Sequence, residues 1–140
     1  MLQLSRDAYL AMIGHAFDCL PEEMCGLIAG PVAPGEGTAV DAPVFYPCHN
    51  AAASAKVYTL DPRDHLRADR DAEDRGLEII GVVHSHTHTD AYPSPTDVRQ
   101  APDPAWHYVI VSLKYEEPVV RSYRIVEGAI IEEPVEVPSV

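Results

Sequence analysis

The chain has 140 residues, 46% of them hydrophobic and 23% charged, which is sufficient for one globular domain over residues 1–140. Its net charge of −12 argues against a nucleic-acid partner, because phosphate contacts need clustered Lys and Arg, and no apolar run approaches the ~20 residues of a membrane span. Its three cysteines, an odd number without a CxxC spacing, argue against a disulfide framework and favour the reducing cytoplasm.

The first half of the chain predicts two helices and three strands. Apolar side chains recur with a 3.6-residue period over residues 5–20, which is typical of a helix with one face on a core. Cys25–Ala29 has the pattern of a buried strand, and prolines and glycines between residues 31 and 37 indicate a loop. Further strands are expected over residues 40–46 and 57–60, before a helix that begins at Asp61-Pro62 and ends at Gly76.

The second half predicts a buried strand over residues 77–86 that ends in His84-Ser85-His86. The segment Ser94-Pro95-Thr96-Asp97 has the pattern of a helix start, with Ser as the N-cap, Pro at the first helical position and a carboxylate in the first turn. Strands are expected over residues 106–113, 119–126 and 129–137. This order predicts an α/β domain with a mixed, largely antiparallel sheet flanked by helices.

His84, His86 and Asp97 form a candidate metal site. Catalytic zinc is usually held by three protein ligands, with a fourth position open for water. Strand side chains alternate faces, so two histidines two positions apart point to the same side, and a carboxylate at a helix start can point back toward a metal. Each residue taken singly is more simply a strand end or a helix cap. His88 also forms a formal pair with His86, and Asp90 is a rival carboxylate, although it lacks the helix start that orients Asp97.

A zinc hydrolase also needs a base near its water, and a carboxylate is a common choice. Glu22 and Glu23 precede the predicted strand at Cys25. Two adjacent glutamates before a short apolar strand are more often part of a solvated turn, so this segment is weak evidence by itself.

The combined motifs resemble those of the JAMM (MPN+) zinc metalloproteases. They are a P-x-E-x-C-G segment at Pro21–Gly26, then H-S-H, seven residues, Ser94, two residues and Asp97. Segments over residues 89–94, 106–112 and 121–126 are similar to the bacterial Mec-type branch, whose members act on sulfur-carrier protein–cysteine adducts. The resemblance covers nearly the whole chain, and it implies the mixed α/β fold of that family.

The resemblance also implies a role for each site residue. Zn2+ would be held by His84, His86 and Asp97, and the spacing to Ser94 selects His84 over His88, which we expect to be a loop side chain near the cleft. Glu23 corresponds to the catalytic glutamate that moves a proton from water to the leaving amine. Ser94 corresponds to the serine that stabilises the oxyanion. Other segments that resemble the surroundings of a substrate groove are Asn50-Ala51-Ala52 and Tyr58.

We therefore expect a zinc-dependent peptidase that serves cysteine biosynthesis. Its substrate would be a small ubiquitin-like sulfur-carrier protein ending in Gly-Gly, from whose C-terminal glycine it would release cysteine. An alternative with the same chemistry is an isopeptidase that removes ubiquitin-like modifiers from lysine side chains. A metal-free MPN scaffold is an alternative of another class, but here every ligand position is filled. The sequence leaves the identity of the carrier and the oligomeric state open, and it predicts no nucleic-acid or membrane partner.

Overall fold

The computed structural model describes residues 1–32, 39–101 and 103–138. Most of the predicted loop over residues 31–37 therefore lies outside the described residues. The elements in chain order are β1 (Leu2–Leu4), α1 (Arg6–Asp18), β2 (Cys25–Pro31), β3 (Val40–Ala42), β4 (Val44–Cys48), α2 (Pro62–Asp74), β5 (Leu77–His86), α3 (Pro95–Arg99), β6 (His107–Ser112), β7 (Val119–Val126), β8 (Ala129–Glu133) and β9 (Val135–Glu136).

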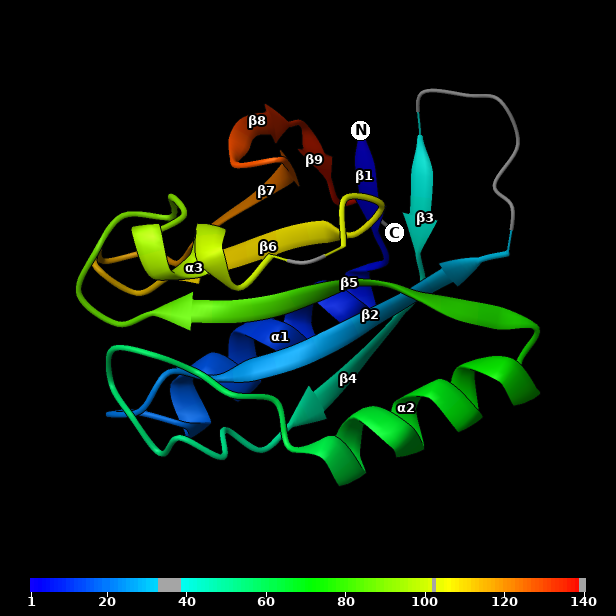
Figure 1. The fold of residues 1–140 in the computed structure, drawn as a ribbon, viewed down its shortest axis with the longest axis horizontal. Helices are drawn as coiled ribbons and strands as arrows, with labels where there is room; N and C mark the ends of the chain where they lie inside the picture. Colours follow the sequence, from blue (N-terminus) through cyan, green and yellow to red (C-terminus); the bar gives the residue numbers. More distant parts are fainter. Residues whose placement is uncertain (33–38, 102, 139–140) are drawn as a thin grey trace.

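The main sheet has six strands in the order β4-β2-β5-β6-β7-β8, with β5 and β6 at its centre (Figure 1). Only the β5–β6 pair is parallel, and the other neighbours in this sheet are antiparallel. A second, three-stranded sheet joins β3, β1 and β9. The prediction of an α/β fold with a mixed, largely antiparallel sheet is confirmed.

Each face of the main sheet carries its own hydrophobic core, because successive strand residues point to opposite sides. On β5, Val83 packs in the core that includes α1, whereas Val82 packs in the core that includes Ala68 of α2. The two helices therefore cover opposite faces (Figure 1). His84 and His86 lie two and four positions after Val82, so their side chains point to the same face of β5, the face that α2 covers.

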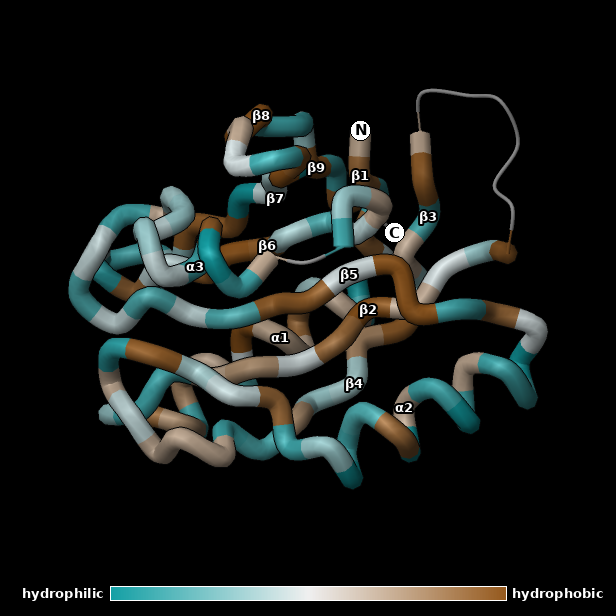
Figure 2. The backbone as a smooth tube through the Cα atoms, in the orientation of Figure 1, coloured by the Kyte–Doolittle hydropathy of each residue, from teal (hydrophilic) through white to brown (hydrophobic). Residues whose placement is uncertain are grey.

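Hydropathy follows this layering. Figure 2 shows hydrophobic residues along the neighbouring strands β2 and β5 and a mostly hydrophilic α2 at the surface. The helix starts are those expected from the sequence: side chains of Ser5, Asp61 and Ser94 accept hydrogen bonds from the first turns of α1, α2 and α3. Among the described helices, none combines the length and apolar character that a membrane crossing requires.

Three predicted strands differ from the structure. The strand expected over residues 40–46 is divided at Pro43, and the one expected over 129–137 is divided at Pro134, so that β9 joins the other sheet. Proline has no N–H to continue a ladder. The strand expected over residues 57–60 was wrong: the segment is a loop with an isolated bridge between Asn50 and Leu60.

Candidate metal centre and active site

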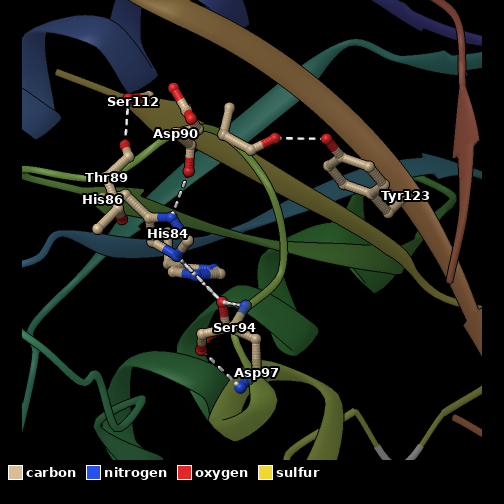
Figure 3. A network of polar contacts seen from close by, with 9 residues as sticks. His84, His86, Thr89, Asp90, Ser94, Asp97, Ser112 and Tyr123 are labelled. Carbon is tan, nitrogen blue, oxygen red and sulfur yellow. Dashed lines mark hydrogen bonds and ion pairs between the residues drawn. The ribbon is translucent and has the colours of Figure 1, made fainter. Parts of the chain in front are cut away.

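The two histidines lie at the C-terminal end of β5, where the neighbouring strands hold the backbone in register. His84 pairs with Cys25 of β2 on one side and with Ile110 of β6 on the other, and His86 pairs with Ser112. Only 3% of His84 and 7% of His86 is exposed. Figure 3 shows both imidazoles directed toward the start of α3. The structure thus brings the two predicted ligands onto one face.

Asp97 reaches the same point from the first turn of α3. The backbone N–H of Ser94 donates to Asp97 Oδ2 at 2.8 Å, and the backbone N–H of Asp97 donates to Ser94 Oγ at 3.1 Å. This reciprocal capping box fixes the carboxylate in orientation. Asp97 Oδ2 then lies 3.2 Å from His84 Nε2 and 3.0 Å from His86 Nε2. The helix cap and the candidate ligand are the same side chain.

These three atoms have the spacing of a zinc site. The Nε2 atoms of His84 and His86 are 3.2 Å apart, so each of the three distances is between 3.0 and 3.2 Å. Tetrahedral zinc with bonds of about 2.0–2.1 Å separates its ligand atoms by roughly 3.3 Å. His86 Nδ1 donates to the Asp90 carbonyl at 2.7 Å, which leaves Nε2 as the nitrogen that can bind a metal. The residues present fit zinc.

Three hydroxyl groups hold the loop that supports His86. Ser112 Oγ donates to the Thr89 carbonyl at 2.5 Å, Tyr123 donates to the Ala91 carbonyl, and Tyr115 donates to the Asp90 carboxylate. The bonds from Ser112 and Tyr123, which come from β6 and β7, are drawn in Figure 3. The Asp90 carbonyl that orients His86 therefore belongs to a segment tied to the sheet on both sides.

Glu23 approaches the histidines from the segment just before β2. The backbone N–H of Met24 donates to Ser85 Oγ at 2.8 Å, and that of Ser85 donates to the Met24 carbonyl at 3.1 Å, so this segment is fixed to β5. A carboxylate oxygen of Glu23 and one ring nitrogen each of His84 and His86 all lie within 4.8 Å of one another. Glu23 could itself be a ligand by this measure. The shorter distances of Asp97 favour Asp97 as the third ligand and Glu23 as the neighbouring base.

The pKa values of the two carboxyl groups are displaced in opposite directions. Burial raises the pKa of Glu23 to about 7, and the nearby Asp97 adds to this, while His86 opposes it. Burial also acts to raise the pKa of Asp97, but hydrogen bonds with His84 and His86 outweigh it and hold that pKa well below its ordinary value. A carboxyl group with a pKa near neutrality is suited to accept and return a proton. Asp97 stays ionised, as a ligand must.

The pKa values of the two histidines are also displaced in opposite directions. Burial lowers the pKa of His84, which keeps its imidazole neutral. Burial acts to lower the pKa of His86 too, but its hydrogen bonds with Asp97 and with the Asp90 carbonyl raise it overall. The ring of Tyr58 stacks on the imidazole of His84, with the ring centroids 4.5 Å apart. The two imidazoles are thus held in defined orientations.

The Ser94 hydroxyl accepts a bond from the Asp97 N–H, and within the described part of the chain its own proton is donated to no protein group. That proton is available to a substrate oxygen. The capping role of Ser94 and its expected catalytic role are therefore compatible, because one uses the lone pairs of the oxygen and the other uses its proton.

A hollow of about 290 Å³ opens beside this group, and its lining is Glu23, Ala55, Lys56, His86, Thr87, His88, Thr89 and Ser94. His88 lies at this hollow as a loop side chain, in agreement with the expectation. A second, mostly apolar hollow of about 330 Å³ lies on the Tyr58 side and includes Leu60, His65 and Trp106. One hollow is thus lined by Glu23, His86 and Ser94, and the other lies beside Tyr58, which stacks on His84.

Lys56 also lines the hollow beside Glu23, and it is not among the residues predicted from the sequence. It is one of only two lysines in the chain, and it follows Asn50 by six residues in a segment already suspected to lie near the substrate. Those two facts were the available signal.

The sequence matches the family model described as prokaryotic homologs of the JAB domain over residues 5–126. It is 43% identical over 139 residues to the CysO-cysteine peptidase of Mycobacterium tuberculosis, an alignment that covers 98% of this chain and 91% of that protein. It is also 33% identical over 116 residues to the desampylase of Haloferax volcanii, with 79% of this chain and 80% of that protein covered.

Solved structures agree with the sequence comparison. A protein from Desulfitobacterium hafniense superposes with a TM-score of 0.89 at 33% identity, covering 100% of this chain and 94% of the other. A JAB1/MPN domain protein from Archaeoglobus fulgidus gives a TM-score of 0.60 at 21% identity over 98% of this chain and 99% of the other, which shows a shared fold. The chain belongs to the family of prokaryotic JAB (JAB1/MPN) domains.

Proposed function

We propose that this protein is a zinc-dependent peptidase of the cytoplasm. Its substrate is a small ubiquitin-like sulfur-carrier protein with a C-terminal Gly-Gly, and it hydrolyses the bond between the last glycine and an attached cysteine. The observation that carries the proposal is that Glu23, whose pKa is about 7, and Asp97 both approach the candidate ligand nitrogens of His84 and His86. The 43% identity to a CysO-cysteine peptidase supports the choice of substrate.

His84, His86 and Asp97 would hold Zn2+. When bound, the ion polarises the scissile carbonyl and makes water acidic enough to attack near neutral pH. The chain's own residues then manage the protons. Glu23 in its ionised form accepts one proton from the water as its oxygen bonds to the glycine carbonyl carbon. It returns that proton to the cysteine nitrogen as the C–N bond breaks, so the products are the carrier carboxylate and free cysteine.

Ser94 stabilises the negative charge that develops on the carbonyl oxygen. Its hydroxyl oxygen is fixed by the Asp97 N–H, and its proton is directed to the substrate. A preorganised donor of this kind has a lower cost of reorganisation than water. The carrier tail would occupy the apolar hollow that Tyr58 lines, because Tyr58 also stacks on His84 and so brings this hollow close to the candidate metal site.

A cleavage assay with purified, zinc-loaded protein tests this function. One substrate is a carrier extended at Gly-Gly by cysteine, and the other is the same carrier joined through Gly-Gly to a lysine side chain. We expect the first to lose the mass of one cysteine residue, and the Glu23→Gln protein to leave it intact. Cleavage of only the isopeptide would contradict the proposal.

That second outcome corresponds to the alternative enzyme, an isopeptidase for ubiquitin-like modifiers. The 33% identity to a desampylase supports it as a candidate, and the same five site residues would serve it. The two substrates differ only in the group on the leaving nitrogen, so the assay separates these candidates directly. Protein that carries no zinc and cleaves neither substrate would favour the scaffold alternative.

A further inference from the structure

We infer that Lys56 binds the free α-carboxylate of the released amino acid, which would make the protein an exopeptidase for a single C-terminal residue. The inference rests on the proposed function and defines the substrate class more narrowly. It is drawn from the hollow that Lys56 shares with Glu23, His86 and Ser94.

The loop that carries Lys56 is built around a buried asparagine. Asn50, of which 4% is exposed, donates through Nδ2 to the Glu23 carbonyl at 3.0 Å and to the Val57 carbonyl at 3.1 Å. Its Oδ1 accepts from the backbone N–H groups of Ala52 and Thr59, both at 3.0 Å. One side chain therefore supplies backbone partners along the whole loop.

Further bonds fix the loop to the catalytic segments. The Glu23 N–H donates to the Ser54 carbonyl at 2.8 Å, and Thr87 Oγ1 donates to the Ala55 carbonyl at 3.2 Å. The Lys56 N–H donates to Ser54 Oγ at 3.1 Å. The residues that flank Lys56 are thus tied to the candidate base and to the strand end after His86, so its side chain starts from a defined position at the hollow.

The direction of the reaction places the leaving residue in this hollow. Glu23 must deliver a proton to the leaving nitrogen, so that nitrogen lies on the Glu23 side. The α-carboxylate carbon of a single leaving residue is only two bonds beyond that nitrogen, about 2.5 Å away. With about 290 Å³, at the lower limit of typical ligand pockets, the hollow suits one residue with a free end.

Charge supports the same assignment. The other lysine, Lys114, pairs with the Asp90 carboxylate, whereas Lys56 forms no ion pair among the described residues. Its hollow is lined by the acidic Glu23 in a protein of net charge −12, so a cation at this position would stabilise an anionic leaving group. A chain that continues beyond the scissile bond presents a neutral amide at this point, which Lys56 would not favour.

The test compares kcat/KM for the Gly-Gly-Cys carrier with a free C-terminal carboxylate and with a C-terminal carboxamide. We expect the zinc-loaded wild type to prefer the acid at least tenfold. Lys56→Met retains the apolar stem and removes the charge, and we expect it to cleave the acid no faster than the amide. Lys114→Met is the matched control and should keep the wild-type ratio. The intrinsic difference between the two leaving groups is common to all three proteins.

Equal rates of the wild type on acid and amide would overturn the inference and leave the proposed function standing, and this comparison needs no variant. Retention of the full preference by Lys56→Met, with its zinc content and melting temperature intact, would overturn it as well. If the zinc-loaded wild type cleaves neither substrate, the proposed function fails and the inference fails with it.

Discussion

The substitution Glu23→Gln measures the energetic cost of keeping a carboxylate next to the histidines. Glu23 is 3% exposed, and within the described residues no protein group donates a hydrogen bond to its carboxylate. Burial therefore disfavours its ionised form and raises its pKa from the ordinary 4.5 to about 7. Glutamine has a similar shape without the charge, so it removes the cost of ionisation.

The size of the effect follows from linkage. One pKa unit corresponds to about 1.4 kcal/mol, so a rise from 4.5 to about 7 corresponds to about 3 kcal/mol. Because the pKa is raised on folding, the contribution of Glu23 to stability is fully present below pH 4.5 and is lost as the pH rises through about 7. Glutamine does not ionise, so the stability of Glu23→Gln has no such pH-dependent contribution from this position.

Urea unfolding of both proteins with a chelator present, at about pH 5 and about pH 8.5, is the assay, since a bound dication would lower the pKa of Glu23. We expect the free energy of unfolding of Glu23→Gln relative to wild type to increase by about 2.5 kcal/mol between the two pH values, because at pH 5 a part of the full contribution is already lost. With zinc restored, the variant should keep its metal and lose about 10²–10⁴-fold in rate. Parallel pH dependences of the two proteins would show that folding does not raise the pKa of Glu23.

Four further outcomes are expected. Asp97→Asn keeps an oxygen for the cap of α3 but loses the anionic ligand, so metal analysis should show much less zinc while the circular dichroism is retained. Ser94→Ala should lower kcat by about 10²–10³ with zinc still bound, as steady-state kinetics on the loaded protein would show. Gly81→Ala would place a Cβ 2.3 Å from the His107 carbonyl oxygen, and thermal unfolding should show a loss of about 1–3 kcal/mol. A chelator should abolish cleavage, and added zinc should restore it.

The parts of the site that depend on local chemistry were predictable from the sequence. The β-branched run before His84 indicates a strand, strand alternation puts His84 and His86 on one face, and Ser94-Pro95 indicates the helix start that orients Asp97. Each of these features is decided by residues within one element. The predicted bounds of β5 and β7 agree with the structure for the same reason.

The parts that depend on distant contacts were not predictable in this way. Glu23 is brought to the histidines by bonds between Met24 and Ser85, which are far apart in the chain, and only the family resemblance pointed to it. The segment over residues 57–60 has strand-like composition, yet its Val57 carbonyl and Thr59 N–H bond to the side chain of Asn50 instead of a neighbouring strand. The position of Lys56 follows from that same buried asparagine, whose role no periodic pattern reveals.

We propose that His84, His86 and Asp97 hold one zinc ion while Glu23 remains beside it as the base. A crystal structure of zinc-loaded protein with anomalous data on both sides of the zinc absorption edge tests this most directly. We predict one anomalous peak per chain, bonded to the two Nε2 atoms and to an Asp97 oxygen at about 2.0–2.2 Å, with the Glu23 carboxylate outside bonding distance. A peak elsewhere, or one in which Glu23 replaces Asp97 as a ligand, would contradict it.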